Sequence, residues 1–188
     1  MSQANRSKRN ACVIGTSDFC SRDPSKDVVG GIVVERLKDL DLFREVKLSF
    51  VGNDYEDIKN RLKKALVEYE PVLIITIGGT GFRPRDVTPE ATSSLYEKYC
   101  SGIVTALHMV CLRYNPNSAI TRLTAGIINN CLVINFPASE KACKDCMKCL
   151  EGFIQLGVEQ IRDNVGINFK TIHALRRTQF YGSSNNVK

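Results

Sequence analysis

The feature that most constrains the fold is an apolar segment that runs directly into a glycine-rich turn. Residues 72–77 form the segment, and Gly78, Gly79 and Gly81 follow within four positions. A short apolar run that ends in glycine is typical of a strand buried on both faces. Closely spaced glycines allow a tight turn whose backbone amides can approach a ligand. The sequence therefore predicts a buried strand followed by a turn that suits phosphate or another anion.

A charged loop and a helix follow the turn. The loop contains two cations and one possible metal ligand, namely Arg83, Arg85 and Asp86. Thr88 is predicted to cap the helix, with Pro89 at its first position and Glu90 in its first turn. We expect this helix to run to about Tyr99 and the next one to span residues 102–114.

Strands alternate with helices along the rest of the chain. Strand patterns occupy residues 11–15, 46–50 and 131–136. Apolar stripes of helical spacing occupy residues 29–40, 58–69 and 142–161. The pair Asn129-Asn130 predicts a tight hairpin before the last strand, because asparagine tolerates positive φ. The alternation predicts an α/β fold, a three-layer sandwich in which helices cover both faces of a mostly parallel sheet.

Most of the positive charge lies at the two ends of the chain. Residues 1–10 carry three basic residues and residues 166–188 carry four, with no acidic residue in either stretch. Removing these seven charges from the net +6 of the 188 residues leaves the middle near −1. We therefore expect a single domain at residues 11–165 between two basic tails, with neither nucleic acid nor a membrane as partner. No secretory signal or membrane-length apolar run is present, so we expect a cytoplasmic protein.

Eight cysteines occur mostly within apolar patterns rather than in a loop-rich scaffold. This distribution fits free thiols in a reducing compartment. The spacing of Cys143, Cys146 and Cys149 could suit zinc or an iron–sulfur cluster, but no fourth ligand lies nearby in the sequence. We therefore expect Cys146 and Cys149 to lie on or beside the apolar stripe of the closing helix.

Small, hydroxyl and acidic residues follow the predicted strands. They are Ser17, Asp18, Asn53, Asp54, residues 78–81 with Asp86, Ala138 and Ser139. The carboxyl ends of parallel strands share one edge of a sheet, where ligands bind. We hypothesise that backbone amides hold a phosphate-bearing ligand there, with a divalent cation shared by carboxylates. Structural roles are the alternatives: Asp54 and Ser139 could cap helices, and Asp86 could stabilise a helix entry. Asp18 fits a loop contact as well as a site contact.

Residues 76–92 resemble the Thr-Thr-Gly-Gly-Thr-Gly…Arg-Asp-Val-Thr-Pro-Glu-Ala-Thr signature of molybdopterin adenylyltransferases, a family that includes the G domain of gephyrin. The resemblance covers roughly residues 10–165. Further matches occur in the family's order at Ser17-Asp18, Asp27, Gly30, Asp54, Thr121-Arg122, Gly126-Ile127 and Asn135-x-Pro137-x-Ser139.

The resemblance implies transfer of AMP from ATP to the phosphate of molybdopterin, with release of pyrophosphate, in molybdenum cofactor biosynthesis. It implies that Asp54 and Asp86 are catalytic and hold Mg²⁺. It also implies a homotrimer that passes its product to a molybdate-inserting enzyme. Substrate or nucleotide contacts are implied for Asp27, Gly30, Thr76, Gly78, Gly79, Thr80, Gly81, Thr121 and Ser139.

The chain departs from the family pattern at four places. Ile77 replaces a threonine, Val28-Val29 replaces a polar pair, Ala138 replaces a glycine and Thr121 replaces a serine. The first two departures remove polar groups beside the expected site. They keep a second hypothesis open, a non-catalytic molybdopterin-binding or trimeric scaffold domain.

Overall fold

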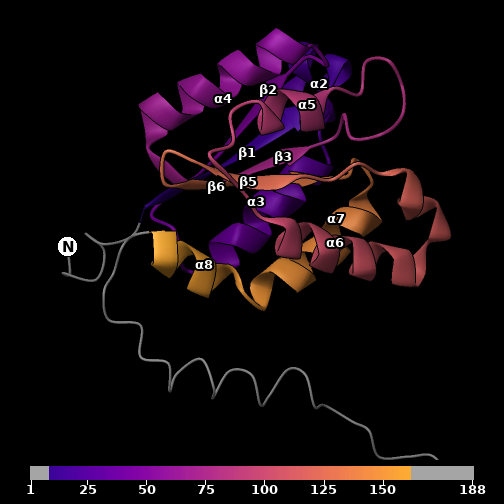
Figure 1. The fold of residues 1–188 in the computed structure, drawn as a ribbon. Helices are drawn as coiled ribbons and strands as arrows, with labels where there is room; N and C mark the ends of the chain where they lie inside the picture. Colours follow the sequence, from indigo (N-terminus) through magenta and orange to yellow (C-terminus); the bar gives the residue numbers. More distant parts are fainter. Residues whose placement is uncertain (1–8, 162–188) are drawn as a thin grey trace, which may run out of the picture.

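Six strands form one sheet with the order β2-β1-β3-β6-β5-β4 in the computed structural model, which describes residues 9–161 (Figure 1). The strands are β1 (Asn10–Thr16), β2 (Val46–Val51), β3 (Pro71–Ile77), β4 (Lys98–Tyr99), β5 (Ala125–Ile128) and β6 (Cys131–Phe136). The first four strands in this order run parallel, whereas β5 pairs antiparallel with both β6 and β4. The predicted mostly parallel sheet is confirmed.

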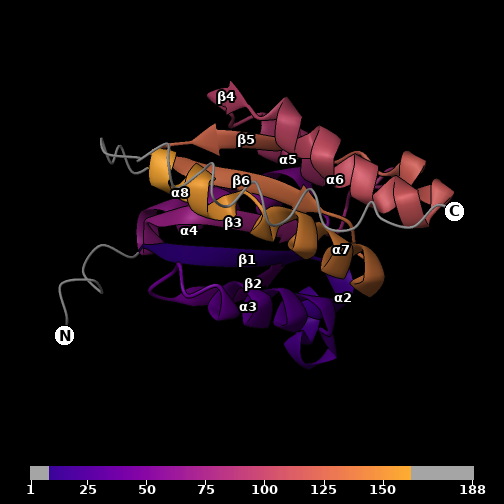
Figure 2. The same ribbon diagram turned by 90° about the horizontal axis from the view of Figure 1, so that it is seen from below.

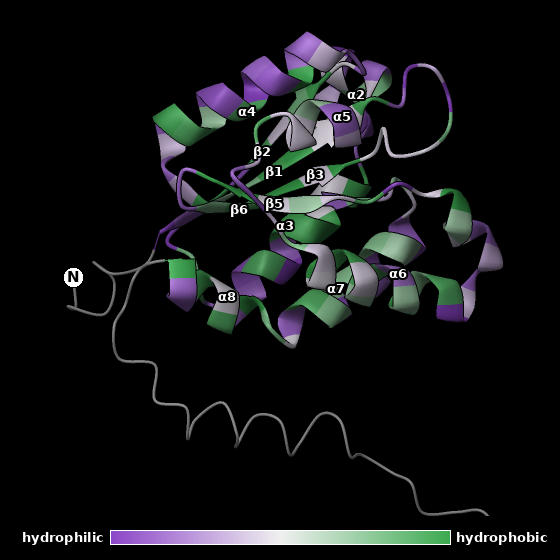
Figure 3. Cartoon of the chain, viewed as in Figure 1, coloured by the Kyte–Doolittle hydropathy of each residue, from purple (hydrophilic) through white to green (hydrophobic). Residues whose placement is uncertain are grey.

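Helices cover both faces of this sheet, so the predicted three layers are also confirmed (Figures 1 and 2). One face carries α4 (Tyr55–Tyr69) and α5 (Thr88–Ser93). The other face carries α3 (Val29–Asp39), α6 (Ser101–Tyr114), α7 (Glu140–Glu151) and α8 (Ile154–Ile161). Short helical turns lie in the connections, namely α2 (Asp18–Arg22), η1 (Pro24–Lys26) and η2 (Pro116–Ile120). Apolar residues line the sides of the helices that face the sheet (Figure 3).

The two middle strands, β3 and β6, are buried along their whole length. Ile74 packs with Ile58 and Leu62 of α4 on one face. Leu73 and Ile75 pack into the larger core under the other face. Each fully buried side chain of this size contributes about 1.5–3 kcal/mol. The turns after β3 and β6 therefore begin directly at the ends of two fully buried strands.

The predicted helix from Thr88 to about Tyr99 is wrong in its second half. It ends at Ser93, and Lys98 and Tyr99 form the edge strand β4 by pairing with Ile127 and Gly126. A Cβ on Gly126 would lie 2.3 Å from the ring of Tyr96, so this glycine leaves room for the tyrosine between the helix and the strand. The pairing partner lies nearly thirty residues away, which the local pattern does not show.

The closing helix is two helices rather than one. It stops at Glu151 and resumes at Ile154, after Gly152 and Phe153. Both halves still pack on the same core, because Leu150 and Ile154 are buried side by side in it. The predicted hairpin is confirmed, with φ of 47° at Asn129 and 61° at Asn130.

The predicted tails fall largely outside the described residues. Residues 1–8 and 166–188 are outside them, as are residues 162–165 of the expected domain. The sheet begins one residue earlier than predicted, because Asn10 is buried as the first residue of β1 and donates to the carbonyl of Tyr69 at 2.6 Å. Between residues 9 and 161, every helix is too short or too polar to cross a membrane.

Candidate functional site

The turn after β3 has the tight geometry that its glycines predict. Gly78 and Gly79 have φ of 99° and 62°, which other residues rarely adopt. The amide of Gly78 donates to the carbonyl of Phe136 at 3.1 Å, which ties the turn to the end of β6. A Cβ on Gly79 would lie 2.2 Å from the hydroxyl of Thr88, so only glycine fits there.

Thr88 packs against this turn instead of capping α5. The residue preceding the helix is Val87, and it makes no capping bond from its side chain. The hydroxyl of Thr88 donates to the hydroxyl of Thr16 at 3.1 Å, and Thr16 donates to the carbonyl of Ile77 at 3.1 Å. The expected cap is therefore wrong, because the hydroxyl of Thr88 donates to Thr16 at the end of β1 instead. This chain of bonds joins α5 to the glycine turn.

Three successive amides of the turn remain available to a ligand. Among residues 9–161, the amides of Gly79, Thr80 and Gly81 donate no hydrogen bond. Unpaired amides in a glycine turn at the carboxyl end of a strand are suited to bind anions. The geometry therefore agrees with the anion-binding turn expected from the sequence.

Asp86 is held over Gly81. Its Oδ2 accepts from the amide of Arg83 at 3.0 Å, and its own amide donates to the carbonyl of Arg83 at 2.9 Å. A Cβ on Gly81 would lie 2.7 Å from the same Oδ2. Gly81 thus leaves the space in which this carboxylate lies.

Asp18 joins the two loops that carry the predicted catalytic aspartates. Its Oδ1 accepts from the amide of Asn53, the neighbour of Asp54, at 2.9 Å. The same oxygen accepts from the guanidinium of Arg85, the neighbour of Asp86, at 2.9 Å. The bond from Asn53, and then the charge and bond of Arg85, lower the pKa of Asp18 below its usual range. The loops after β1, β2 and β3 therefore meet around one carboxylate oxygen.

Asp54 is the N-cap of α4, as the structural alternative for this residue predicts. Its Oδ1 accepts from the amides of Glu56 and Asp57 at 3.0 and 3.1 Å. The neighbouring Asn53 has a buried side-chain oxygen with no hydrogen-bond partner among the described residues. A buried unpaired oxygen is costly, and it marks this loop as a place where a ligand or water would supply a donor.

Asp27 and Ser139 also accept hydrogen bonds from backbone amides at the starts of helices. The carboxylate of Asp27 accepts from the amides of Gly30 at 3.0 Å and Gly31 at 2.9 Å, in the first turn of α3. A Cβ on Gly30 would lie 2.7 Å from Asp27 Oδ2 and 2.9 Å from Leu48, so a larger residue would displace this carboxylate. Ser139 accepts from the amide of Ala142 at the start of α7.

Thr76, Gly78 and Thr80 are buried, whereas Gly79 and Gly81 are half-buried. The hydroxyl of Thr76 accepts from the side-chain amide of Asn135 at 2.7 Å. The carbonyl of Thr80 accepts from the amide of Arg122 at 2.8 Å. These contacts connect the turn to β6 and to the segment before β5. The Thr76 side chain is fully buried and bonds to the neighbouring strand β6.

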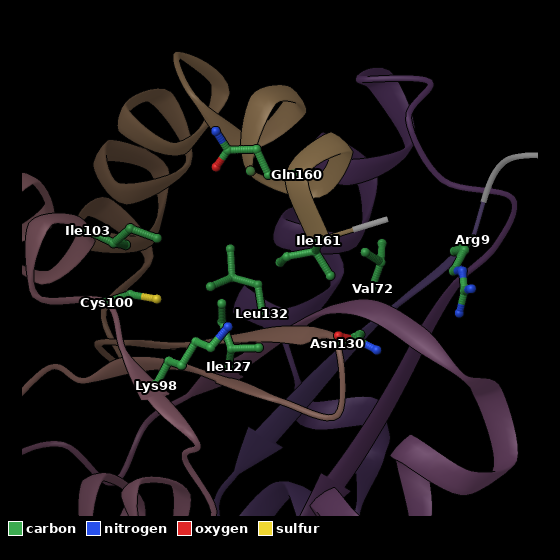
Figure 4. A pocket seen from close by; sticks show the side chains of 11 residues that line it. Arg9, Val72, Lys98, Cys100, Ile103, Ile127, Asn130, Leu132, Gln160 and Ile161 are labelled. Atoms are coloured by element: carbon green, nitrogen blue, oxygen red, sulfur yellow. The ribbon is translucent and has the colours of Figure 1, made fainter. Parts of the chain in front are cut away.

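Thr121 and Ser139 line a cavity of about 290 Å³ at the same end of the sheet. Pro137 and Ala138 form another part of its wall, and Cys111 and Tyr114 of α6 close it. A larger cavity of about 570 Å³ lies at the other end, between α6 and α8 (Figure 4). None of the predicted site residues lines that larger cavity, so the residues expected to act together do not lie there.

The carboxylates at this edge of the sheet are too few to surround a Mg²⁺ ion by themselves. Among residues 9–161, no three His, Cys, Asp or Glu side chains are grouped to form a metal cage. Mg²⁺ at nucleotide sites usually takes one or two carboxylates, and water and phosphate oxygens complete its shell. Asp54 and Asp86 each use a single carboxylate oxygen in the hydrogen bonds described above. These residues therefore fit a magnesium ion brought in with phosphates.

Three of the four departures from the family pattern suit their places in the fold. Ile77 is buried in the larger core, so the hydrophobic replacement suits its surroundings. Val28 is 61% exposed, and Val29 packs against the core from the first turn of α3. Ala138 is not among the positive-φ residues, so it does not need the freedom of a glycine.

Comparison with known proteins shows the family to which the chain belongs. Residues 12–155 match the family described as "Probable molybdopterin binding domain". The molybdopterin adenylyltransferase of Helicobacter pylori (strain J99) is 33% identical over 169 residues, which are 89% of this chain and 96% of that protein. The molybdenum cofactor synthesis protein cinnamon of Drosophila melanogaster is 35% identical over 159 residues. This match covers 85% of the chain but only 26% of cinnamon.

Solved structures show the same fold. The molybdopterin biosynthesis Mog protein from Mycobacterium ulcerans superposes with a TM-score of 0.76 and 29% identity, over 81% of this chain and 99% of that one. The tungsten cofactor synthesizing protein MoaB from Pyrococcus furiosus has a TM-score of 0.73 at 24% identity, over 84% of this chain and 99% of that one. The chain therefore belongs to the molybdopterin-binding domain family of molybdenum cofactor biosynthesis, as the resemblance of residues 76–92 predicts.

Proposed function

We propose that this protein is a molybdopterin adenylyltransferase, which transfers AMP from ATP to the phosphate of molybdopterin and releases pyrophosphate. The observation that carries the proposal is the junction at Asp18, whose Oδ1 holds the neighbours of both Asp54 and Asp86. Relatives named molybdopterin adenylyltransferase that match along almost their full length support it.

The two substrates are both anionic, so their repulsion is the main electrostatic problem of the reaction. The phosphate of molybdopterin is ionised at neutral pH and attacks the α-phosphorus of ATP, from which pyrophosphate leaves. No strong general base is required. Binding and orientation by the free amides of residues 79–81 would supply most of the rate increase.

Asp54 and Asp86 are assigned to hold Mg²⁺, which when bound would neutralise part of the phosphate charge. Each carboxylate is already oriented by backbone amides, Asp54 by those of α4 and Asp86 by that of Arg83. The cavity beside Thr121 and Ser139 is assigned to part of one substrate, with the Ser139 hydroxyl as a polar contact at its wall.

Incubation with molybdopterin, ATP and Mg²⁺ tests the proposal. We expect adenylylated molybdopterin from the wild-type protein and a loss of at least about 10²-fold in Asp86→Asn. Asp39→Asn is the matched control, because Asp39 is exposed at the end of α3 and should leave turnover unchanged. Tight binding of molybdopterin without turnover would instead favour the non-catalytic scaffold.

We further propose that the protein assembles as a homotrimer through the outer face of α6. Met109 and Leu112 on this helix are 68% and 42% exposed, and Tyr99 just before it is 70% exposed. Clustered exposed apolar side chains favour a protein interface. Light scattering should give a trimer for the wild type and a monomer for Met109→Glu. A wild-type monomer would contradict this assignment.

A further inference from the structure

The guanidinium of Arg122 donates hydrogen bonds to both ends of the loop that carries Asp86. It lies between η2 and β5, 36 residues from Asp86 in sequence. Its Nε donates to the carbonyl of Gly81 at 2.8 Å, and its Nη2 donates to the carbonyl of Asp86. Its Nη1 pairs with Glu90 in the first turn of α5. One guanidinium therefore joins the two ends of the loop formed by residues 81–86.

The loop has little other support. Residues 81–86 contain no helix or strand, and the Phe82 side chain is 68% exposed. Within the loop, the bonds between Arg83 and Asp86 close a single turn. The Arg85–Asp18 pair also links the loop to a distant part of the chain, but it is exposed, so it contributes little stability. The base of the loop is thus held mainly by Arg122.

The guanidinium is occupied by these contacts. Bidentate binding of a phosphate needs two adjacent N–H groups of the planar fork. The Nε and Nη2 edge already faces the carbonyls of Gly81 and Asp86, while Nη1 faces Glu90. This arrangement favours a role in holding the loop over direct contact with the triphosphate.

We propose that Arg122 is a positioning residue, which fixes Asp86 over the glycine turn without itself contacting nucleotide. The inference rests on the proposed adenylyl transfer for its kinetic part, whereas its structural part concerns the loop alone. Misplacement of a reacting or metal-holding group by about 1 Å can cost about 10²-fold in rate. Lysine carries the charge of arginine but lacks the fork, so it can replace only one of the contacts.

Two readouts test this inference on the full chain. The first is the rate of trypsin cleavage after Arg85, measured in the absence of ATP and molybdopterin. The side chain of Arg85 is 66% exposed. Arg83, the other arginine of the loop, precedes a proline, and trypsin cleaves such bonds poorly. We expect Arg122→Gln to speed this cleavage about tenfold or more relative to other sites. Leu62→Ala is the control, because it destabilises the core under α4 and should affect all sites alike.

The second readout separates kcat from KM. We expect Arg122→Gln to lower kcat about 10²-fold with the KM for ATP changed less than about threefold, and Arg122→Lys to recover only part of kcat. Arg36→Gln, at an exposed position of α3, should match the wild type. A raised KM for ATP with unchanged kcat would show direct nucleotide binding and overturn the inference.

Unchanged cleavage after Arg85 in Arg122→Gln would also overturn it. If that variant does not fold, Glu90→Ala tests the same guanidinium by removing its anchor, with faster cleavage expected. Absence of adenylyl transfer in the wild type would contradict the proposed function, but the cleavage result would still decide whether Arg122 holds the loop.

Discussion

At the scale of single residues, several site carboxylates orient backbone while leaving an oxygen for a ligand. Asp54 uses Oδ1 to cap α4, and Asp86 uses Oδ2 to close the turn with Arg83. A single oxygen of Asp18 accepts hydrogen bonds from two loops. A helix cap and a metal ligand need different parts of the same side chain, so the two roles can be separated by substitution.

Substitution of Asp54 by asparagine and by alanine should separate its two roles. Asparagine caps helices as well as aspartate does, so Asp54→Asn should change the free energy of unfolding by less than about 0.5 kcal/mol. Asp54→Ala should cost about 1 kcal/mol. Both variants should lose adenylyl transfer, because neither carries the charge. Denaturant unfolding and the turnover measurement together check this, and an active Asp54→Asn would contradict the metal role.

The lowered pKa of Asp18 predicts a dependence of stability on pH. Because the folded protein favours the ionised form, the stabilisation by this carboxylate is complete above its unfolded pKa of about 3.9. It declines as the pH falls through the lower folded pKa. We therefore expect Asp18→Asn to be less stable than wild type at pH 7, with the difference shrinking below about pH 4. Urea unfolding across pH 3–7 measures this, and a difference that grows in acid would contradict it.

At the scale of elements, the end of the parallel sheet is fastened by buried polar groups. The amide of Asn135 on β6 donates to Thr76 on β3, and its carbonyl oxygen contacts the hydroxyl of Thr92 in α5. Thr124, before β5, contacts the same oxygen. Three elements and the segment before β5 are thereby held in one arrangement, which explains how a short helix such as α5 keeps its place against the sheet.

Removal of the Asn135 side chain should therefore be costly. Asn135→Ala leaves the buried hydroxyl of Thr76 without its partner, whereas Thr92 and Thr124 each lose one of several partners. A buried polar group left without a bond costs about 1–3 kcal/mol, and the lost contacts of the asparagine side chain add to this. We expect a loss of about 3 kcal/mol in the free energy of unfolding. Asn117→Ala, at an exposed position in η2, should lie within about 0.5 kcal/mol of wild type. Equal stabilities of the two variants would show that the network contributes nothing.

Sequence patterns predicted the structural features that depend on residues close together in the chain. The strand of residues 72–77, the hairpin at Asn129-Asn130 and the Asp54 cap are all local, and the structure contains each. The predicted cap at Thr88 was wrong because a hydroxyl 72 residues away competes for its bond. The junction at Asp18 joins residues 35 and 67 positions apart, and no local pattern specifies such contacts.

At the scale of the whole molecule, the sheet separates two buried cores, and the thiols are distributed between them. Cys12 and Cys131 lie on the side of α4, whereas Cys111, Cys143 and Cys146 lie on the side of α6 and α7. The sulfur atoms of Cys111 and Cys146 are 3.5 Å apart, and both residues are buried. Burial raises the pKa of Cys12 to about 11 and that of Cys143 to about 12. The thiols of Cys12 and Cys143 are therefore protonated and buried in the folded protein.

A thiol reagent should therefore report global unfolding. At pH 8 we expect prompt reaction only at the half-buried Cys20, Cys100 and Cys149. The five buried thiols should react at the rate of unfolding, so the second phase should accelerate with urea as the loss of circular dichroism does. Prompt labelling of Cys143 or Cys146 in the native protein, identified by mass spectrometry, would mean that the core under α7 opens locally.

The most direct test of the central claim is single-turnover adenylyl transfer, with wild type, Asp86→Asn and Asp39→Asn compared under saturating ATP, Mg²⁺ and molybdopterin. The structure predicts equal product from wild type and Asp39→Asn, and at least about 10²-fold slower formation in Asp86→Asn, because only Asp86 lies over the glycine turn at the Asp18 junction. Equal rates in all three proteins would contradict the claim that the loops after β1, β2 and β3 build the catalytic site.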